Sequence, residues 1–179
     1  MKQVPPLPIA SQVLLCLIAI PCGFCDYRSR RVPNWLTFPG ICLGIGLNVF
    51  QAGMAGLWSS LQGLAVALAI YGSLYLLRAL GAADVKLMAA IGAVAGPAHW
   101  LRIFLLTALC GGVVAVVLIV MRGRFRHTMS NAGAVLANLS RAQPPYRSSP
   151  ELDVRSTAGL RLPHAVMIGC ATLLYICLR

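Results

Sequence analysis

Charged residues are scarce in this 179-residue chain, at 11% of the sequence, whereas apolar residues make up 59%. The mean hydropathy of +0.79 lies far from the balance of a soluble domain. This composition excludes a large soluble domain and indicates a protein embedded in a lipid bilayer. The length leaves room for one membrane domain of about six helices of about 20 residues each.

Negative charge is scarcer still, because fifteen Lys and Arg residues stand against four Asp and Glu residues, for a formal net charge of +11. Such a charge can indicate nucleic-acid binding, but these basic residues lie between apolar runs and form no basic domain. The distribution therefore favours a membrane topology, with anionic lipid headgroups as partners and no nucleic acid.

Cysteine pairs of the kind that hold zinc are also lacking. All seven cysteines fall within apolar stretches, so we expect neither a disulfide framework nor a zinc cluster. Cys22 and Cys25 form a single CxxC, which without a second pair is more typical of core packing than of a metal site. The sequence predicts no metal and no organic cofactor.

Uninterrupted apolar runs predict six transmembrane helices, so that residues 1–179 form a single, all-α, polytopic membrane domain. The fourth run is short and rich in Ala and Gly, and we expect it to be packed centrally. The first could be a signal peptide, but no small-x-small cleavage site precedes the basic cluster at Arg28, and we interpret it as a span. The runs cover residues 8–26, 35–52, 57–78, 84–98, 100–121 and 162–178.

The basic residues predict the orientation of these helices. Twelve of the fifteen fall in segments that share one side of the membrane, which the positive-inside rule assigns to the cytoplasm. Trp58 and Trp100 would then lie at the outer boundary and Trp35 at the inner one, as in an aromatic belt. The basic loop 122–161 would lie inside, with a possible amphipathic helix on the membrane surface.

Two of the four acidic residues occupy positions where a carboxyl group is costly. Glu151 and Asp153 fall in the long loop, but Asp26 closes the first apolar run and Asp84 opens the fourth. The topology derived from basic residues alone puts Asp26 and Asp84 on the same side at similar depth. Each also has a structural interpretation, because Asp84 could cap its helix and Asp26 could pair with Arg28.

Two carboxyl groups in a low-dielectric pocket tend to share one proton, and such a pair can activate water for peptide hydrolysis. The helix dipole favours the anion of Asp84 and disfavours that of Asp26, which predicts Asp84 as the base and Asp26 as its protonated partner. No Ser/His/Asp set is visible, since the histidines fall in three separate places, namely His99, His127 and His164.

The segments around the aspartates resemble the type IV prepilin peptidase family. Residues 26–34, DYRSRRVPN, are similar to its first-aspartate segment, and residues 81–87, GAADVKL, to its GxGD-type second segment. Residues 162–169, LPHAVMIG, are similar to the start of its last helix. The chain departs from the pattern at Ala83, where the family usually has glycine, and a methyl group there would hinder a positive φ or a close backbone approach.

This resemblance implies a membrane aspartic endopeptidase of the bacterial inner membrane. It would remove the leader peptide from a membrane-inserted prepilin or pseudopilin at the cytoplasmic face, after a glycine. The compact length, without a cysteine-rich module, resembles the short Flp/Tad branch. By the same resemblance the catalytic residues are Asp26 and Asp84, and the supporting or substrate-binding residues are Lys86, Gly81, Pro33 and Asn34.

Local geometry suggests how the supporting residues act. Pro33 and Asn34 are expected to end one helix and to cap the next. Lys86 is two residues after Asp84 and faces another way on a helix, so we interpret it as a contact to a headgroup or to the substrate backbone.

Two other functions remain open on the sequence. Carboxylates in membranes also relay protons, which would suit a small proton-coupled transporter. A non-enzymatic subunit of a secretion or pilus assembly machine is the other alternative. The sequence makes no prediction of the oligomeric state.

Overall fold

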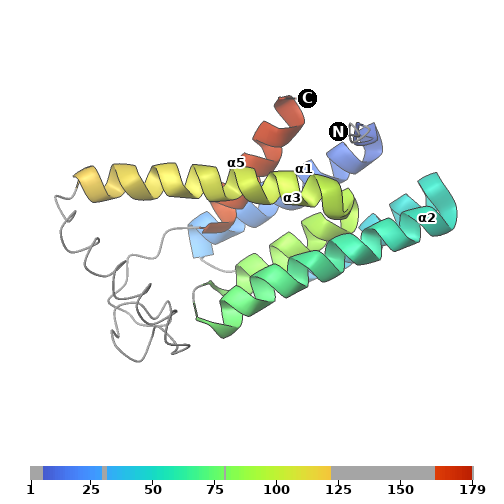
Figure 1. The fold of residues 1–179 in the computed structure, drawn as a ribbon, viewed down its shortest axis with the longest axis horizontal. Coiled ribbons are helices and arrows are strands. Elements are labelled where there is room, and N and C mark those ends of the chain that lie inside the picture. The colour runs from blue at the N-terminus through green and yellow to red at the C-terminus, as the bar shows by residue number, and fades with distance from the viewer. Residues whose placement is uncertain (1–5, 30–31, 79, 122–163, 179) are drawn as a thin grey trace.

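The computed structural model describes residues 6–29, 32–78, 80–121 and 164–178. Within these ranges the chain is helical and contains no strand, in agreement with the predicted all-α class. Three of its helices are long and apolar enough to cross a membrane, whereas the last is apolar but shorter. The helices are α1 (Ile9–Ser29), α2 (Asn34–Leu76), α3 (Ala82–Met121) and α5 (His164–Cys177) (Figure 1).

Glycine breaks divide α2 and α3 into two helical segments each. Gly53 has a φ of 57° and Gly96 a φ of 72°, in the left-handed region that residues with a Cβ adopt only at a cost. Pro97 follows the second break and lacks a backbone donor. Figure 1 shows both helices doubling back here, at one end of the molecule. The breaks fall close to the predicted gaps, and the crossing of a membrane by six spans stays a prediction.

The first segment of α3 forms the centre of the bundle, as predicted for the fourth apolar run. Every residue from Leu87 to Gly96 is buried. Gly63 of α2 lies so close to Gly92 that a Cβ on either residue would collide with the carbonyl oxygen of the other. Close approach of this kind needs small residues at helical spacing. Helix α2 supplies them as a buried stripe of Gly56, Ser60, Gly63 and Ala67.

The side chain of Asn48 connects the two segments of α2 with α3 near the glycine breaks. Nδ2 of Asn48 lies 2.8 Å from Oγ of Ser60, 3.1 Å from the carbonyl oxygen of Ala93 and 3.0 Å from that of Val94. In an unbroken helix, the carbonyl of Ala93 would accept from the backbone N–H of residue 97, which is a proline. Asn48 therefore satisfies the carbonyl of Ala93, to which the helix offers no donor, and also lies within hydrogen-bond distance of that of Val94.

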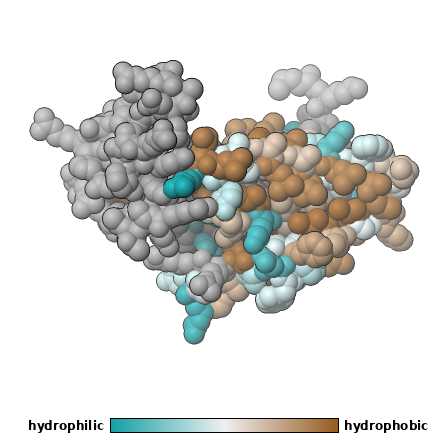
Figure 2. Space-filling view, turned by 90° about the horizontal axis from the view of Figure 1, so that it is seen from below, coloured by the Kyte–Doolittle hydropathy of each residue, from teal (hydrophilic) through white to brown (hydrophobic). Residues whose placement is uncertain are grey.

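The described helices expose many large apolar side chains, and Figure 2 shows apolar residues over much of the coloured part of the face that it presents. Trp35 and Trp58 are exposed, as a membrane belt requires, but Trp100 is fully buried. Nε1 of Trp100 donates to the carbonyl of Met88 at 3.0 Å, and its ring stacks on Phe104. The belt prediction is wrong for Trp100, because α3 folds back at its break and turns this side chain onto its own first segment.

Candidate active site

The end of α1 and the start of α3 lie at the same end of the molecule, opposite the two glycine breaks (Figure 1). Asp26 lies in the last turn of α1 and Asp84 in the first turn of α3. Each residue is 7% exposed, and the two carboxyl groups lie within electrostatic range of each other. Since α1 continues to Ser29, Asp26 lies inside its helix and does not close it as predicted.

The turn that begins α3 holds the carboxyl group of Asp84. The backbone N–H of Gly81 donates to Oδ2 of Asp84 at 3.3 Å, and the backbone N–H of Asp84 donates to the carbonyl of Gly81 at 3.2 Å. A carboxylate in the first turn also interacts favourably with the helix dipole. Asp84 therefore stabilises the start of its helix and lies within electrostatic range of the second aspartate.

Neither Gly81 nor Ala83 needs the conformational freedom of glycine. Among the described residues, positive φ angles are confined to Arg78 and to the two break glycines. A Cβ on Gly81 would meet Oδ2 of Asp84 at 3.5 Å, an ordinary van der Waals distance. Ala83 is helical and packs against the core. The strain anticipated for a methyl group at position 83 is thus absent from this structure.

Asp26 binds the start of α5, a contact between residues 139 positions apart. The backbone N–H of Ala165 donates to Oδ2 of Asp26 at 3.2 Å. Both carboxyl groups of the pair therefore meet an N–H group at a helix N-terminus, where an anion is favoured. The dipole asymmetry that predicted Asp84 as the ionised member and Asp26 as the protonated one no longer distinguishes them.

His164 belongs to this site, although the sequence did not reveal it. It is the first residue of α5, directly before Ala165, and lies within electrostatic range of Asp84. The predicted topology already put the start of the last apolar run on the same side as both aspartates. It gave no sign of which helices pack together, and that packing brings His164 to the pair.

The start of α2 is tied to the first turn of α3 by a side-chain hydrogen bond. Nζ of Lys86 donates to Oδ1 of Asn34 at 2.8 Å. The predicted capping role of Asn34 is wrong, because α2 begins at Asn34 itself, Pro33 occupies the N-cap position, and no side chain caps the helix. The side chain of Asn34 turns to Lys86 instead. This partner of Lys86 is an amide and not a carboxylate.

An open pocket of about 350 Å³ lies between the end of α1 and the start of α2. Cys25 precedes Asp26 in the chain, and Asn34 binds Lys86, two residues after Asp84. The pocket is thus lined by the residue before Asp26 and by the hydrogen-bond partner of Lys86. Its lining residues are Cys25, Ser29, Val32, Pro33, Asn34 and Trp35.

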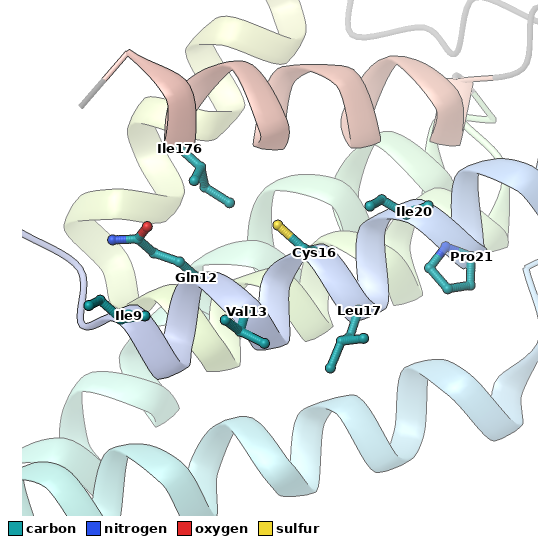
Figure 3. Close-up of a pocket in the computed structure, with 8 residues that line it drawn as sticks. All are labelled: Ile9, Gln12, Val13, Cys16, Leu17, Ile20, Pro21 and Ile176. Atoms are coloured by element: carbon teal, nitrogen blue, oxygen red, sulfur yellow. The ribbon is translucent and has the colours of Figure 1, made fainter.

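A separate apolar groove of about 390 Å³ lies along the outer face of α1 (Figure 3). It is lined by side chains of α1 between Ile9 and Pro21, together with Ile176 of α5. The side-chain amide of Gln12, which lines the groove, donates through Nε2 to the carbonyl oxygen of Leu7 at 2.8 Å. None of the lining residues carries a carboxyl or imidazole group, so this groove is no part of the candidate site and suits acyl chains.

The cysteines of the described segments differ in burial, because Cys42, Cys170 and Cys177 are exposed and Cys16, Cys25 and Cys110 are partly buried. Of the CxxC pair, Cys22 is fully buried in the core, as predicted, whereas Cys25 is only partly buried and lines the pocket between α1 and α2. Across the described segments, no group of three His, Cys, Asp or Glu side chains could hold a metal ion. The arrangement places two buried carboxyl groups within electrostatic range of each other.

Comparison with known families gives an independent observation. The model of the type IV leader peptidase family matches residues 13–116, more than half of the chain, and this segment includes both Asp26 and Asp84. No curated protein and no solved structure matches the chain. Because the matched segment ends before α5, His164 lies outside it.

Proposed function

The chain belongs to the type IV leader peptidase family, and from this premise we propose that it is an aspartic endopeptidase in which Asp26 and Asp84 jointly activate water. The family gives the general activity, which is that of a membrane prepilin peptidase. The observation that supports the aspartic mechanism is that two buried carboxyl groups, from α1 and α3, lie within electrostatic range of each other at one end of the bundle.

The proposed reaction follows from a carboxyl pair that shares one proton. The ionised member takes a proton from water, and the oxygen of this water attacks the carbonyl carbon of the scissile peptide. The protonated member donates a hydrogen bond to the carbonyl oxygen. When the C–N bond breaks, the proton taken from water passes to the leaving amine. Because the pair titrates jointly, either aspartate can begin as the base.

We propose that the chain crosses the membrane six times and that the end of the bundle with Asp26 and Asp84 faces the cytoplasm. The 43 residues of α2 would extend about 65 Å as one straight helix. This is about twice the thickness of the hydrocarbon core, so the break at Gly53 allows two crossings. The break at Gly96 likewise allows α3, with 40 residues, to cross the membrane twice. The positive-inside rule supports this orientation, since Arg28, Arg78 and Lys86 lie at the end of the bundle that holds Asp26 and Asp84.

The proposed substrate is a Flp-type prepilin, held in the membrane by its apolar helix and cut after a glycine. The pocket between α1 and α2 would receive the extended backbone beside the scissile bond. A glycine at that bond suits the site, because no side chain has to enter beside carboxyl groups that are 7% exposed.

The test is leader removal by the purified full-length protein in liposomes that contain a Flp-type prepilin. We expect mass spectrometry to show one cut, directly after a glycine, with the apolar helix retained in the mature product. If the chain leaves intact a prepilin that another leader peptidase cleaves, the proposal is wrong. Proton flux into the same liposomes would then favour the transporter, and its absence the assembly subunit.

The bond between Lys86 and Asn34 yields a prediction about substrate binding. Lys86→Met is expected to lower kcat/KM about three- to tenfold, because the pocket loses a charge-assisted hydrogen bond that holds the start of α2. Asn34→Ala should lower kcat/KM by a similar factor, and the double variant Asn34→Ala/Lys86→Met should lose no more than either single variant. Arg102→Met, a substitution beyond the break in α3, is the control without effect. Losses that multiply in the double variant would contradict a shared role.

A further inference from the structure

The carboxyl group of Asp26 is buried at a helix end that disfavours its anion. Asp26 is 7% exposed and lies in the last turn of α1, where the dipole of its own helix is negative. A carboxylate that is shielded from water needs hydrogen-bond donors from the protein. Helix α5 supplies one, because the backbone N–H of Ala165, a fully buried residue, donates to Oδ2 of Asp26 at 3.2 Å. Figure 1 shows the start of α5 beside the end of α1.

The start of α5 receives its cap from another helix. Ala165 is the second residue of α5, and the first four N–H groups of a helix have no partner within it. A Ser, Thr, Asp or Asn directly before a helix usually accepts from one of these groups. The residue before α5 in the sequence is Pro163, whose side chain has no oxygen. Asp26 of α1 therefore does for α5 what a capping side chain ordinarily does.

The contact thus serves both partners. We propose that Ala165 is a positioning residue, whose backbone N–H holds the carboxyl group of Asp26 for catalysis while Asp26 caps α5. This inference rests on the proposed function. Asp84 differs, because its donor is the N–H of Gly81 in its own turn. The orientation of Asp84 is therefore set locally, whereas that of Asp26 depends on how α5 packs against α1.

Small residues hold the start of α5 against α1. A Cβ on Gly23 of α1 would lie 3.7 Å from Cα of Val166, and one on Gly169 of α5 would lie 3.3 Å from the carbonyl oxygen of Ala19. Helices in such close backbone contact have fixed relative positions, and so do Asp26 and its donor. Helix α5 lies outside residues 13–116, which the family model matches, so its role follows from packing in this chain.

The test removes one N–H group and leaves every side chain in place. In the full-length protein, Ala165 is replaced by lactic acid, its hydroxy-acid analogue, which turns the backbone N–H into an ester oxygen. We expect kcat for leader removal in liposomes to fall about tenfold, because Asp26 loses a hydrogen bond of the strong, charge-assisted kind. KM should stay at the wild-type value, because the donor acts on Asp26 and not on the substrate.

The matched control is the same replacement one residue later, at Val166, by the hydroxy-acid analogue of valine. Each ester also weakens the carbonyl acceptor before it, but the ester at position 165 is the one that removes the donor to Asp26. The Val166 ester should therefore cleave at the wild-type rate. An equal loss of kcat in both esters would overturn the inference, since it would reflect a weakened α5 and not a lost donor.

Thermal unfolding in detergent tests the capping of α5. Asp26→Asn keeps an oxygen that can accept from Ala165, whereas Asp26→Ala does not, so Asp26→Ala should have a Tm lower by about 2–4 °C. In protein that carries the Ala165 ester, the same two variants should have equal Tm values, because the donor is already gone. A difference that persists in the ester protein would show that Asp26 does not cap α5 through this N–H.

Failure of the proposed function is a separate outcome. If Asp26→Asn cleaves like the wild type, the proposed function and the positioning role both fail. If Asp26→Asn is inactive but the Ala165 ester keeps the kcat of the wild type, the positioning role alone is overturned.

Discussion

Asp84→Asn and Asp26→Asn are each expected to lower kcat for leader removal by about 10²- to 10⁴-fold, the usual contribution of a positioned acid or base. Asn has nearly the shape of Asp and keeps an oxygen that can accept from Gly81 or from Ala165, so the local backbone should be retained. It cannot take a proton from water. The measurement is single-turnover cleavage of a prepilin in liposomes with enzyme in excess.

The matched control is the same substitution at a different aspartate. Asp153→Asn, in the basic loop of the sequence, should cleave at the wild-type rate. Thermal unfolding in detergent checks that all three variants fold, and we expect Tm values within a few degrees of the wild type. If either Asp26→Asn or Asp84→Asn is well folded and retains more than about a tenth of wild-type kcat, the paired mechanism is wrong.

Gly63→Ala is expected to destabilise the fold strongly. A Cβ at position 63 would lie against the carbonyl oxygen of Gly92 and 2.8 Å from Cα of Gly96. These are backbone atoms that no rotamer change can move, so α2 and α3 would have to separate along their main interface. We expect a cost of about 3 kcal/mol, at the upper end for overpacked cores, measured as a lower Tm in detergent.

Gly72→Ala is the control on the same helix segment. No atom lies within 4 Å of a Cβ at position 72, so alanine there should leave Tm unchanged or raise it slightly, by its higher helix propensity. If Gly63→Ala and Gly72→Ala have the same Tm, the backbone contact between α2 and α3 is not what sets the stability of this bundle.

Composition and the spacing of apolar runs predict much of this fold. The all-α class follows from the runs themselves, and the central position of Leu87–Gly96 follows from their Ala and Gly content. The common end of Asp26 and Asp84 follows from the basic residues, which were counted without reference to the aspartates. Each of these features depends on local composition or on order along the chain, and both can be read from a sequence.

Features that depend on which helix faces meet could not be predicted in this way. Trp100 has the position of a belt residue, but the break in α3 turns it inward. Asn34 has the position of a cap, but Lys86 engages its side chain from another helix. Asn48 of α2 binds carbonyls of α3, and His164 of α5 lies within electrostatic range of Asp84, whereas apolar periodicity identifies a buried face without naming its partner.

The most direct test of joint action is the double variant Asp26→Asn/Asp84→Asn, compared with both single variants in the same single-turnover assay. Groups that work as one unit give losses that do not multiply, so the double variant should be about as slow as the slower single variant. A loss in the double variant equal to the product of the two single losses would show that Asp26 and Asp84 act separately, and would contradict the carboxyl pair.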